Sequence, residues 1–276
     1  MMLKPTAVNL GDSHVMAIIN LTPDSFYGAS RHLTTVEARS TVERAVGEGA
    51  TIVDIGGYSS RPGARDIDVE EEWRRVYMGL EAVREADCAV AVSIDTFRAE
   101  IVRRAYDEFG EFVVNDISAG EADDRMVATV AQLQLPYVAM HMRGTPTTMQ
   151  SMTDYDEGVV SAVCNYFKCR VEELKHAGIS PQNIILDPGF GFAKSVAQNF
   201  ELMQGLDAIR ELGYPLLIGV SRKSMIYKPL GVTPEDALPG SLALAWEVLR
   251  GGSAILRVHD VAATRQIVEL SKHYYR

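Results

Sequence analysis

The feature that most constrains the fold is a repeating unit, in which a short apolar run stops abruptly at a polar residue and a helical segment follows after a loop. Buried strands that alternate with helices form a parallel sheet with right-handed crossovers. The sequence therefore predicts an α/β fold, a (β/α)8 TIM barrel. The expected strands are His14–Ile19, Thr51–Ile55, Ala89–Ile94, Phe112–Val114, Tyr137–Met140, Ile184–Leu186, Pro215–Val220 and Ala254–Val258.

The segments between these runs carry apolar residues at helical spacing, and several of them end at glycine, a common helix stop. The chain has 276 residues and no break in composition, so we expect one barrel domain over residues 1–276 with residues 1–13 as a lead-in segment. The expected helices are Thr34–Gly49, Val69–Glu85, Phe97–Phe109, Asp123–Gln134, Tyr155–Ala177, Phe200–Leu212, Pro239–Leu249 and Asp260–His273.

The overall charge argues against a general binder of nucleic acid or of anionic membranes, because a net charge of -10 repels polyphosphate. Cys88, Cys164 and Cys169 have no metal-ligand spacing and are too few for a disulfide framework, so we expect buried small apolar groups in a reducing compartment. The sequence shows neither a signal-peptide pattern nor an apolar run that could span a bilayer. We therefore expect a cytoplasmic protein.

The stretch Asp187–Lys194 is the strongest single indication of a binding site. Asp187 follows a buried apolar run and precedes a glycine-rich turn, so its carboxylate should point into a pocket. The alternative is that Asp187 caps the next helix, with Pro188 fixing the exit angle of the chain. The recurrence of polar residues at other strand ends favours the binding site.

In a TIM barrel the loops that follow the strands share one rim, which holds the active site. Polar residues that are far apart in the sequence should therefore converge there. They are Asn20, Arg61, Asp95, Asn115, Asp187, Lys223, Arg257 and His259.

One subset of these residues suits a phosphate group. Arg61, Arg257 and His259 are cationic or can be, and guanidinium groups match phosphate oxygens in charge-assisted hydrogen bonds. Asn20 adds a neutral oxygen. Asn20 and Asp24 could also hold Mg2+, which prefers a few protein oxygens together with phosphate and water.

The other subset suits a flat heterocycle with several N–H donors and one carbonyl. Ionised Asp95 and Asp187 only accept hydrogen bonds, Asn115 does both, and Lys223 only donates. The sequence contains no order of residues that predicts a serine or cysteine nucleophile with its base, so covalent hydrolysis is not supported.

Three further residues are expected to have structural roles or to pack on the ligand. His14 and His141 are interpreted as structural histidines. Met140 ends an apolar run and is expected to pack on the ligand or in the core.

Motifs in the same order resemble dihydropteroate synthase from about residue 14 to the C-terminus. The resemblance implies Mg2+-dependent condensation of 6-hydroxymethyl-7,8-dihydropterin diphosphate with para-aminobenzoate in folate biosynthesis, a homodimer, and inhibition by sulfonamides. The motifs are Asn20–Phe26, Gly56–Gly63, Asp95-Thr96, Asn115-Asp116, His141-Met142, Asp187–Lys194, Ser221–Ser224 and Arg257–Val261.

The resemblance also implies a role for individual residues. Pterin-binding residues would be Asp95, Asn115, Met140, Asp187, Phe192 and Lys223. Diphosphate-binding residues would be Asn20, Arg61, Arg257 and His259, with the metal at Asn20. Para-aminobenzoate-binding residues would be Phe26, Ser60, Arg61, Pro62, Ser221 and Lys223. Catalytic residues would be Asp95, Lys223, Arg257 and His259.

The implied substrates predict an SN1-like substitution. An arylamine is already a neutral nucleophile, so cleavage of the carbon–oxygen bond is the difficult step. The dihydropterin ring can delocalise the resulting positive charge, which Asp95 would stabilise, while the cationic residues hold the departing diphosphate. Two loops would exclude water that could capture the cation.

Two residues depart from the family pattern, since Tyr58 stands where an acid is common and Ala193 where glycine is common. Two alternative functions are a pterin-binding methyltransferase domain and a non-catalytic pterin-binding homologue. Methyl transfer has no diphosphate to hold, so it would have no use for Arg61, Arg257 and His259.

Overall fold

A parallel eight-stranded sheet forms the centre of the protein, for which we describe a computed structural model in residues 9, 11–22, 34–59, 66–145 and 147–275. The strand order is β6-β5-β4-β3-β2-β1-β8-β7, and a bridge between Leu186 and Leu216 joins the two ends into a closed barrel. The predicted TIM barrel is confirmed. The strands are β1 His14–Asn20, β2 Ile52–Gly56, β3 Ala91–Asp95, β4 Val113–Asp116, β5 Tyr137–Met140, β6 Ile184–Asp187, β7 Leu217–Ile218 and β8 Ile255–Val258.

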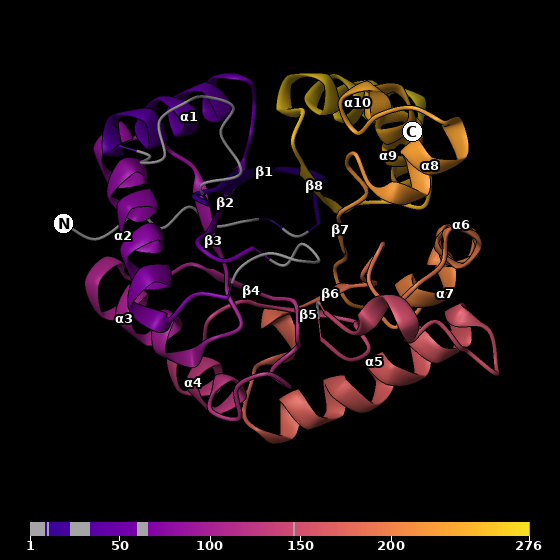
Figure 1. The fold of residues 1–276 in the computed structure, drawn as a ribbon, viewed down its shortest axis with the longest axis horizontal. Helices are drawn as coiled ribbons and strands as arrows, with labels where there is room; N and C mark the ends of the chain where they lie inside the picture. The colour runs from indigo at the N-terminus through magenta and orange to yellow at the C-terminus, as the bar shows by residue number, and fades with distance from the viewer. Residues whose placement is uncertain (1–8, 10, 23–33, 60–65, 146, 276) are drawn as a thin grey trace.

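Helices surround this ring of strands on its outside (Figure 1). In the described residues the α-helices are α1 Thr35–Gly47, α2 Val69–Ala86, α3 Ala99–Phe109, α4 Met126–Leu133, α5 Val159–His176, α6 Val196–Gln204, α7 Leu206–Arg210, α8 Ser224–Leu230, α9 Leu238–Arg250 and α10 Val261–Tyr274. Short 3-10 helices are η2 Met149–Ser151, η3 Pro181–Asn183 and η4 Glu235–Ala237.

Two predictions about the helices were wrong. The helix expected at Phe200–Leu212 begins earlier, because Ser195 caps α6 in a capping box with Gln198, and the segment is divided into α6 and α7 at Gly205. The short helix α8 was not predicted. It begins directly after Lys223, so the end of the β7 exit loop is held by a helix.

The inside of the barrel is closed at one end by apolar side chains, one from each strand. Because successive side chains of a strand point to opposite faces, the residues two and four positions further along also point inward, nearer the carboxyl ends of the strands. Polar residues occupy many of these positions, so the barrel has an apolar floor beneath a polar mouth. The floor residues are Met16, Ile52, Ala91, Val113, Val138, Ile185, Leu217 and Ile255.

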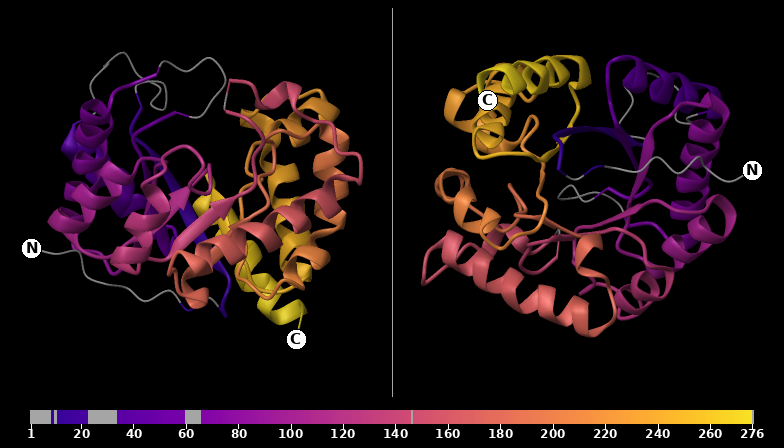
Figure 2. Two further views of the ribbon diagram at one scale, coloured as in Figure 1. Left: turned by 90° about the horizontal axis from the view of Figure 1, so that it is seen from below. Right: turned by 180° about the vertical axis from the view of Figure 1, so that it is seen from behind.

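The residues that point outward from the strands form the main core with the helices, as Val53, Ile55 and Leu186 show. The views from below and from behind show the helices packed around the strands (Figure 2). No helix in the described ranges has the length and apolar character needed to cross a membrane, and the cytoplasmic location stays a prediction.

The prediction that all three cysteines are buried was wrong in part. The thiol of Cys164 is buried and Cys88 is half-buried, but Cys169 is exposed on α5.

Candidate active site

Arg257 and Asp54 together connect side chains from four strands inside the barrel mouth. Its Nε donates to Asp54 Oδ2 at 2.6 Å, and its Nη2 donates to Asp95 Oδ2 at 2.7 Å. Asn115 Nδ2 also donates to Asp54 Oδ2, at 3.1 Å. The residues come from β8, β2, β3 and β4, so the predicted convergence at the carboxyl ends of the strands is observed for Asp95, Asn115 and Arg257.

Asp54 is the member of this cluster that sequence reasoning missed. It lies within the apolar run of β2, two positions after the floor residue Ile52, and its side chain is fully buried. Among the described atoms, Asp54 Oδ1 has no hydrogen-bond partner. A charged residue at an inward-facing position of an otherwise apolar strand was the signal that could have identified it.

A second cluster, from β6 and the loops after β6 and β7, lies at the same mouth. Lys223 Nζ donates to the carbonyl oxygen of Phe190 and lies 4.7 Å from the centre of the Phe192 ring. The buried Asp187 accepts a hydrogen bond from Gly189 N at its Oδ1, at 2.8 Å. Asp187 does not cap a helix, because α6 is capped by Ser195. The capping alternative was wrong.

Burial changes the acid–base properties of these groups. It raises the pKa of Asp95 to about 7, against the opposing charge of Arg257. It raises the pKa of Asp187, which Lys223 partly opposes, and it lowers the pKa of Lys223 to about 8. The pKa values of Asp95 and Lys223 therefore both lie closer to neutral pH than those of the same groups in water.

Asn20 lies at the end of β1, beside the same cluster. A Cβ atom at Gly56 would lie 3.0 Å from Asn20 Oδ1 and 3.7 Å from Asp95 Cβ, so Gly56 leaves the space between these two side chains. The carboxamide oxygen of Asn20 is thereby placed at the rim, on the side of Asp95.

The remaining described residues of the predicted set lie on neighbouring strand ends. Met140 is buried at the end of β5, in register with Asp187. Ser221 Oγ lies 3.0 Å from His259 Nδ1, which joins the exits of β7 and β8. Predicted residues outside the described part of the chain are Asp24, Phe26, Ser60, Arg61 and Pro62.

The two histidines interpreted as structural occupy different ends of the barrel. His14 begins β1, at the end opposite the mouth, where its Nδ1 lies 3.1 Å from Thr51 Oγ1. His141 follows β5 at the mouth, where burial and the charge of Lys194 lower its pKa to about 2. His141 is therefore a neutral ring.

Comparison with known proteins agrees with this geometry. Residues 16–259 match the family described as Pterin binding enzyme. Dihydropteroate synthase from Synechocystis sp. is 40% identical over 265 residues, which cover 96% of this chain and 91% of the relative. The enzyme from Escherichia coli K12 is 40% identical over 259 residues, which cover 94% of this chain and 90% of that one. The chain belongs to the dihydropteroate synthase family. It is accordingly a transferase.

Solved structures of dihydropteroate synthases have the same fold. The Yersinia pestis enzyme, in a complex with a sulfonamide drug, matches with a TM-score of 0.91 and 34% identity over 99% of this chain and 98% of that one. The Xanthomonas albilineans enzyme with 4-aminobenzoic acid matches with a TM-score of 0.87 and 38% identity over 96% of this chain and 94% of that one. The same enzyme in complex with 7,8-dihydropteroate matches with a TM-score of 0.85 and 36% identity over 97% of this chain and 95% of that one.

The two departures from the dihydropteroate synthase pattern are accommodated locally. Ala193 has φ +49, a left-handed conformation that explains why glycine is common at this position. Tyr58 packs edge-to-face on Phe97 with ring centres 5.0 Å apart, and the Arg98 guanidinium lies 5.4 Å from its ring centre. Where an acid is common in the family, the aromatic side chain of Tyr58 contacts two residues of the loop that follows β3.

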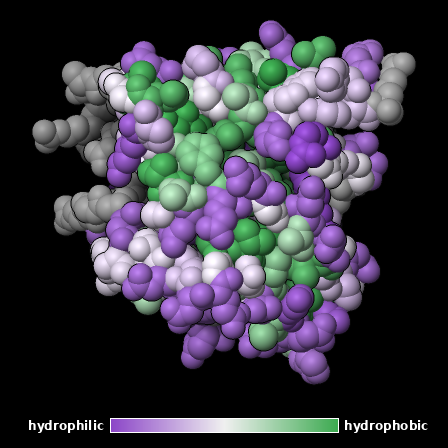
Figure 3. All heavy atoms as spheres, turned by 90° about the vertical axis from the view of Figure 1, so that its right-hand side faces the viewer, coloured by the Kyte–Doolittle hydropathy of each residue, from purple (hydrophilic) through white to green (hydrophobic). Residues whose placement is uncertain are grey.

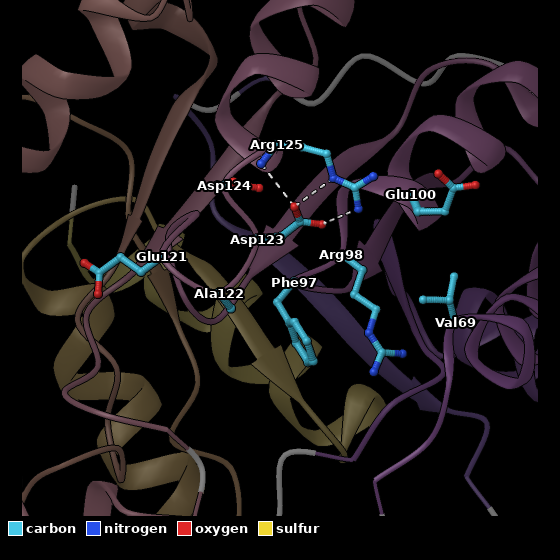
Figure 4. A pocket seen from close by; sticks show the side chains of 9 residues that line it. All are labelled: Val69, Phe97, Arg98, Glu100, Glu121, Ala122, Asp123, Asp124 and Arg125. Carbon is cyan, nitrogen blue, oxygen red and sulfur yellow. Dashed lines mark hydrogen bonds and ion pairs between the residues drawn. The ribbon is translucent and has the colours of Figure 1, made fainter.

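A pocket of about 510 Å³ lies beside α3 and contains none of the predicted site residues (Figure 4). Asp123 is paired with Arg125 and also accepts a hydrogen bond from Ala99 N at the start of α3. Arg98 lies over the Phe97 ring and pairs with the buried Glu72. Because these charged groups already have partners that hold the helices together, we assign no function to this pocket.

The shifted pKa values of two buried lysines predict how the free energy of unfolding depends on pH. Burial lowers the pKa of Lys223 to about 8, and the charge of Arg257 contributes to this shift. Burial also lowers the pKa of Lys194 to about 7, and the charges of Lys223 and Arg143 contribute to this shift. The negative charge of Asp187 opposes both shifts. From pH 7 to about 10 the unfolded chain holds protons that the folded chain has released, so these lysines should add stability as pH rises, by at most about 1.4 kcal/mol per pH unit each.

Urea unfolding between pH 6 and 9 measures this dependence. In Lys194→Met the part of the rise that begins near pH 7 should be missing, while the part that begins near pH 8 remains. Identical slopes in the parent and variant above pH 7 would contradict the assignment to Lys194.

Proposed function

We propose that the enzyme condenses 6-hydroxymethyl-7,8-dihydropterin diphosphate with para-aminobenzoate, giving 7,8-dihydropteroate and diphosphate in folate biosynthesis. The observation that carries the proposal is the single mouth at which Arg257 is bonded to Asp54 and Asp95 while Lys223 lies near Asp187. The complexes of the Xanthomonas albilineans enzyme with 4-aminobenzoic acid and with 7,8-dihydropteroate support the two ligand classes.

The acceptor groups suit the pterin ring. Asp95 and Asp187 would accept hydrogen bonds from ring and amino N–H groups, whereas Lys223 and the amide of Asn115 would donate to acceptor atoms of the ring. Met140 would pack on the ring, because it is buried beside Asp187. Phe192, whose ring lies beside Lys223, would flank the same ligand.

The cationic side of the mouth suits the diphosphate. Arg257 would form charge-assisted hydrogen bonds to its oxygens, and His259 adjoins Ser221 on the next strand exit. The residues fit Mg2+ in the donor type that they offer, since the oxygen of Asn20 is at the rim and Mg2+ takes a few protein oxygens and completes its shell with phosphate and water. When bound, the ion would neutralise charge on the leaving group.

The chain's residues support an SN1-like reaction. The para-aminobenzoate amine is neutral and needs no strong base, so the residues of the mouth must mainly favour loss of the diphosphate. Arg257 and His259 would hold the departing diphosphate, and Asp95 would stabilise the positive charge left on the pterin methylene. Ser221 and Lys223 would orient para-aminobenzoate at the open side.

Diphosphate release tests the reaction. With the dihydropterin diphosphate and Mg2+, diphosphate should appear rapidly once para-aminobenzoate is added and slowly without it. A set of substituted anilines tests the SN1-like step, since at saturation the rate should not follow the nucleophilicity of the amine. No release with both substrates would contradict the synthase reaction, and a rate that rises with nucleophilicity would contradict only the dissociative step.

We also propose a homodimer that is inhibited by sulfonamides and works in the cytoplasm. The complex of the Yersinia pestis enzyme with a sulfonamide drug supports the inhibition. Large apolar side chains are exposed at Phe200 on α6, Leu230 on α8 and Val232 after it. Figure 3 shows the molecule from the right-hand side of Figure 1, and on this face apolar residues gather among polar ones. Light scattering of the purified chain would measure the oligomeric state.

A further inference from the structure

We propose that Lys194 is a positioning residue, which together with His141 fixes the loop 188–193 so that Asp187 and Lys223 face the pterin. The inference rests on the proposed function and goes beyond it, because Lys194 lies behind the binding residues and would not touch the ligand.

Lys194 is a buried amine that is held by neutral groups. Its Nζ lies 3.0 Å from each of Gly189 O, Phe192 O and His141 Nδ1, and the residue is only 4% exposed. Within the described part of the chain, no carboxylate is in ion-pair contact with this amine. A buried lysine without an ion pair is costly and therefore rare. The three contacts must therefore offset much of the cost of burying this amine.

The two carbonyl partners belong to residues whose other groups reach the site. Gly189 accepts from Lys194 with its carbonyl and donates from its amide to Asp187 Oδ1, at 2.8 Å. Phe192 accepts from Lys194 with its carbonyl, while its ring lies 4.7 Å from Lys223 Nζ. Phe190 lies between Gly189 and Phe192 in the sequence, and its carbonyl oxygen accepts a hydrogen bond from Lys223 Nζ. Through their carbonyl groups, Lys194 therefore holds the two residues whose amide or ring contacts Asp187 or Lys223.

His141 connects this loop to the neighbouring strand exit. Its backbone amide donates to Asp187 O at 2.9 Å, and its ring is buried. An ammonium on Lys194 would donate to all three partners, and a neutral amine would donate to the two carbonyls and accept from the Nδ1–H tautomer of His141. The exits of β5 and β6 thus stay joined in either protonation state.

A double-mutant cycle between Lys194 and Lys223 tests the proposal. Binding of 6-hydroxymethyl-7,8-dihydropterin diphosphate is measured by calorimetry for the parent, Lys194→Met, Lys223→Met and the double variant. Lys194→Met should weaken binding about ten-fold or more in the parent, but less than about three-fold when Lys223 is already methionine. Lys194→Arg, which keeps a cationic donor, should recover part of the loss.

Arg170→Met is the matched control. Arg170 donates from Nε to Ala119 O in the β4 exit loop at 2.8 Å, so its loss also frees a loop carbonyl. Among the described residues, no hydrogen bond or ring contact joins that loop to Lys223. Its effect on binding should be the same with and without Lys223. Should Lys194→Met not fold, Lys194→Gln replaces it, because the amide can still donate to one loop carbonyl.

The outcomes separate the two proposals. A parent protein that does not bind the dihydropterin diphosphate would contradict the proposed function itself. A parent that binds, with Lys194 and Lys223 effects that multiply independently, would overturn the positioning role alone. The positioning role would be supported if the effects of Lys194→Met and Lys223→Met on binding do not multiply, while those of Arg170→Met and Lys223→Met do.

Discussion

Replacing Arg257 with methionine should abolish measurable synthase activity and lower the free energy of unfolding by about 3–5 kcal/mol. The guanidinium contacts Asp54 at 2.6 Å and Asp95 at 2.7 Å, and Asp54 is fully buried. Without it, two carboxylates remain in the barrel mouth with no cation between them. The leaving diphosphate of the proposed reaction would also lose a cationic contact, which by itself costs about 10²–10³ in rate at comparable sites.

Two variants control this experiment. Arg257→Lys keeps the charge, but a single ammonium cannot reproduce the fork that spans Asp54 and Asp95, so its losses should be intermediate. Arg39→Met removes an exposed arginine paired with Glu43 and should change stability by less than about 1 kcal/mol. Urea unfolding and diphosphate release measure both effects. Stability within 1 kcal/mol of the parent, or activity within ten-fold, would show that Arg257 does not organise the mouth.

Replacing Gly189 with alanine should cost about 3 kcal/mol or more of stability and most of the activity. Gly189 has φ +70, a left-handed conformation that disfavours a side chain, and a Cβ atom there would lie 2.0 Å from the backbone oxygen of His141. Backbone cannot move aside as a flexible side chain can. The loop must therefore shift, and Asp187 loses the amide that fixes its carboxylate.

Gly213→Ala separates the contact from the backbone conformation. Gly213 has a similar φ of +81, but a Cβ atom there meets nothing within 4 Å. The substitution should cost only about 1 kcal/mol, without loss of activity. Equal costs for the two variants would mean that the contact with His141 has no effect. Urea unfolding and the diphosphate-release assay again give the two measurements.

Some features of the site could be read from spacing alone, because a strand presents alternate residues to one face and a barrel collects all strand ends at one rim. Asp95, Asn115 and Asp187 were predicted in this way. Asp54 was missed because it stands within an apolar run, where nothing in the sequence shows which face is the inside of the barrel. Lys194 was part of a recognised motif, but its carbonyl partners are set by the path of the loop backbone.

The sequence by itself determined the barrel, its strand ends and some of the polar residues at the mouth, such as Asp95, Asn115 and Asp187, since these depend on local patterns of apolar and polar residues. Tertiary structure alone decided which of these residues are bonded to one another. Asp54 and Arg257 are 203 residues apart, and Lys194 and His141 are 53 apart. Such contacts depend on the register of neighbouring strands and on the exact path of the loops, which local preferences do not specify.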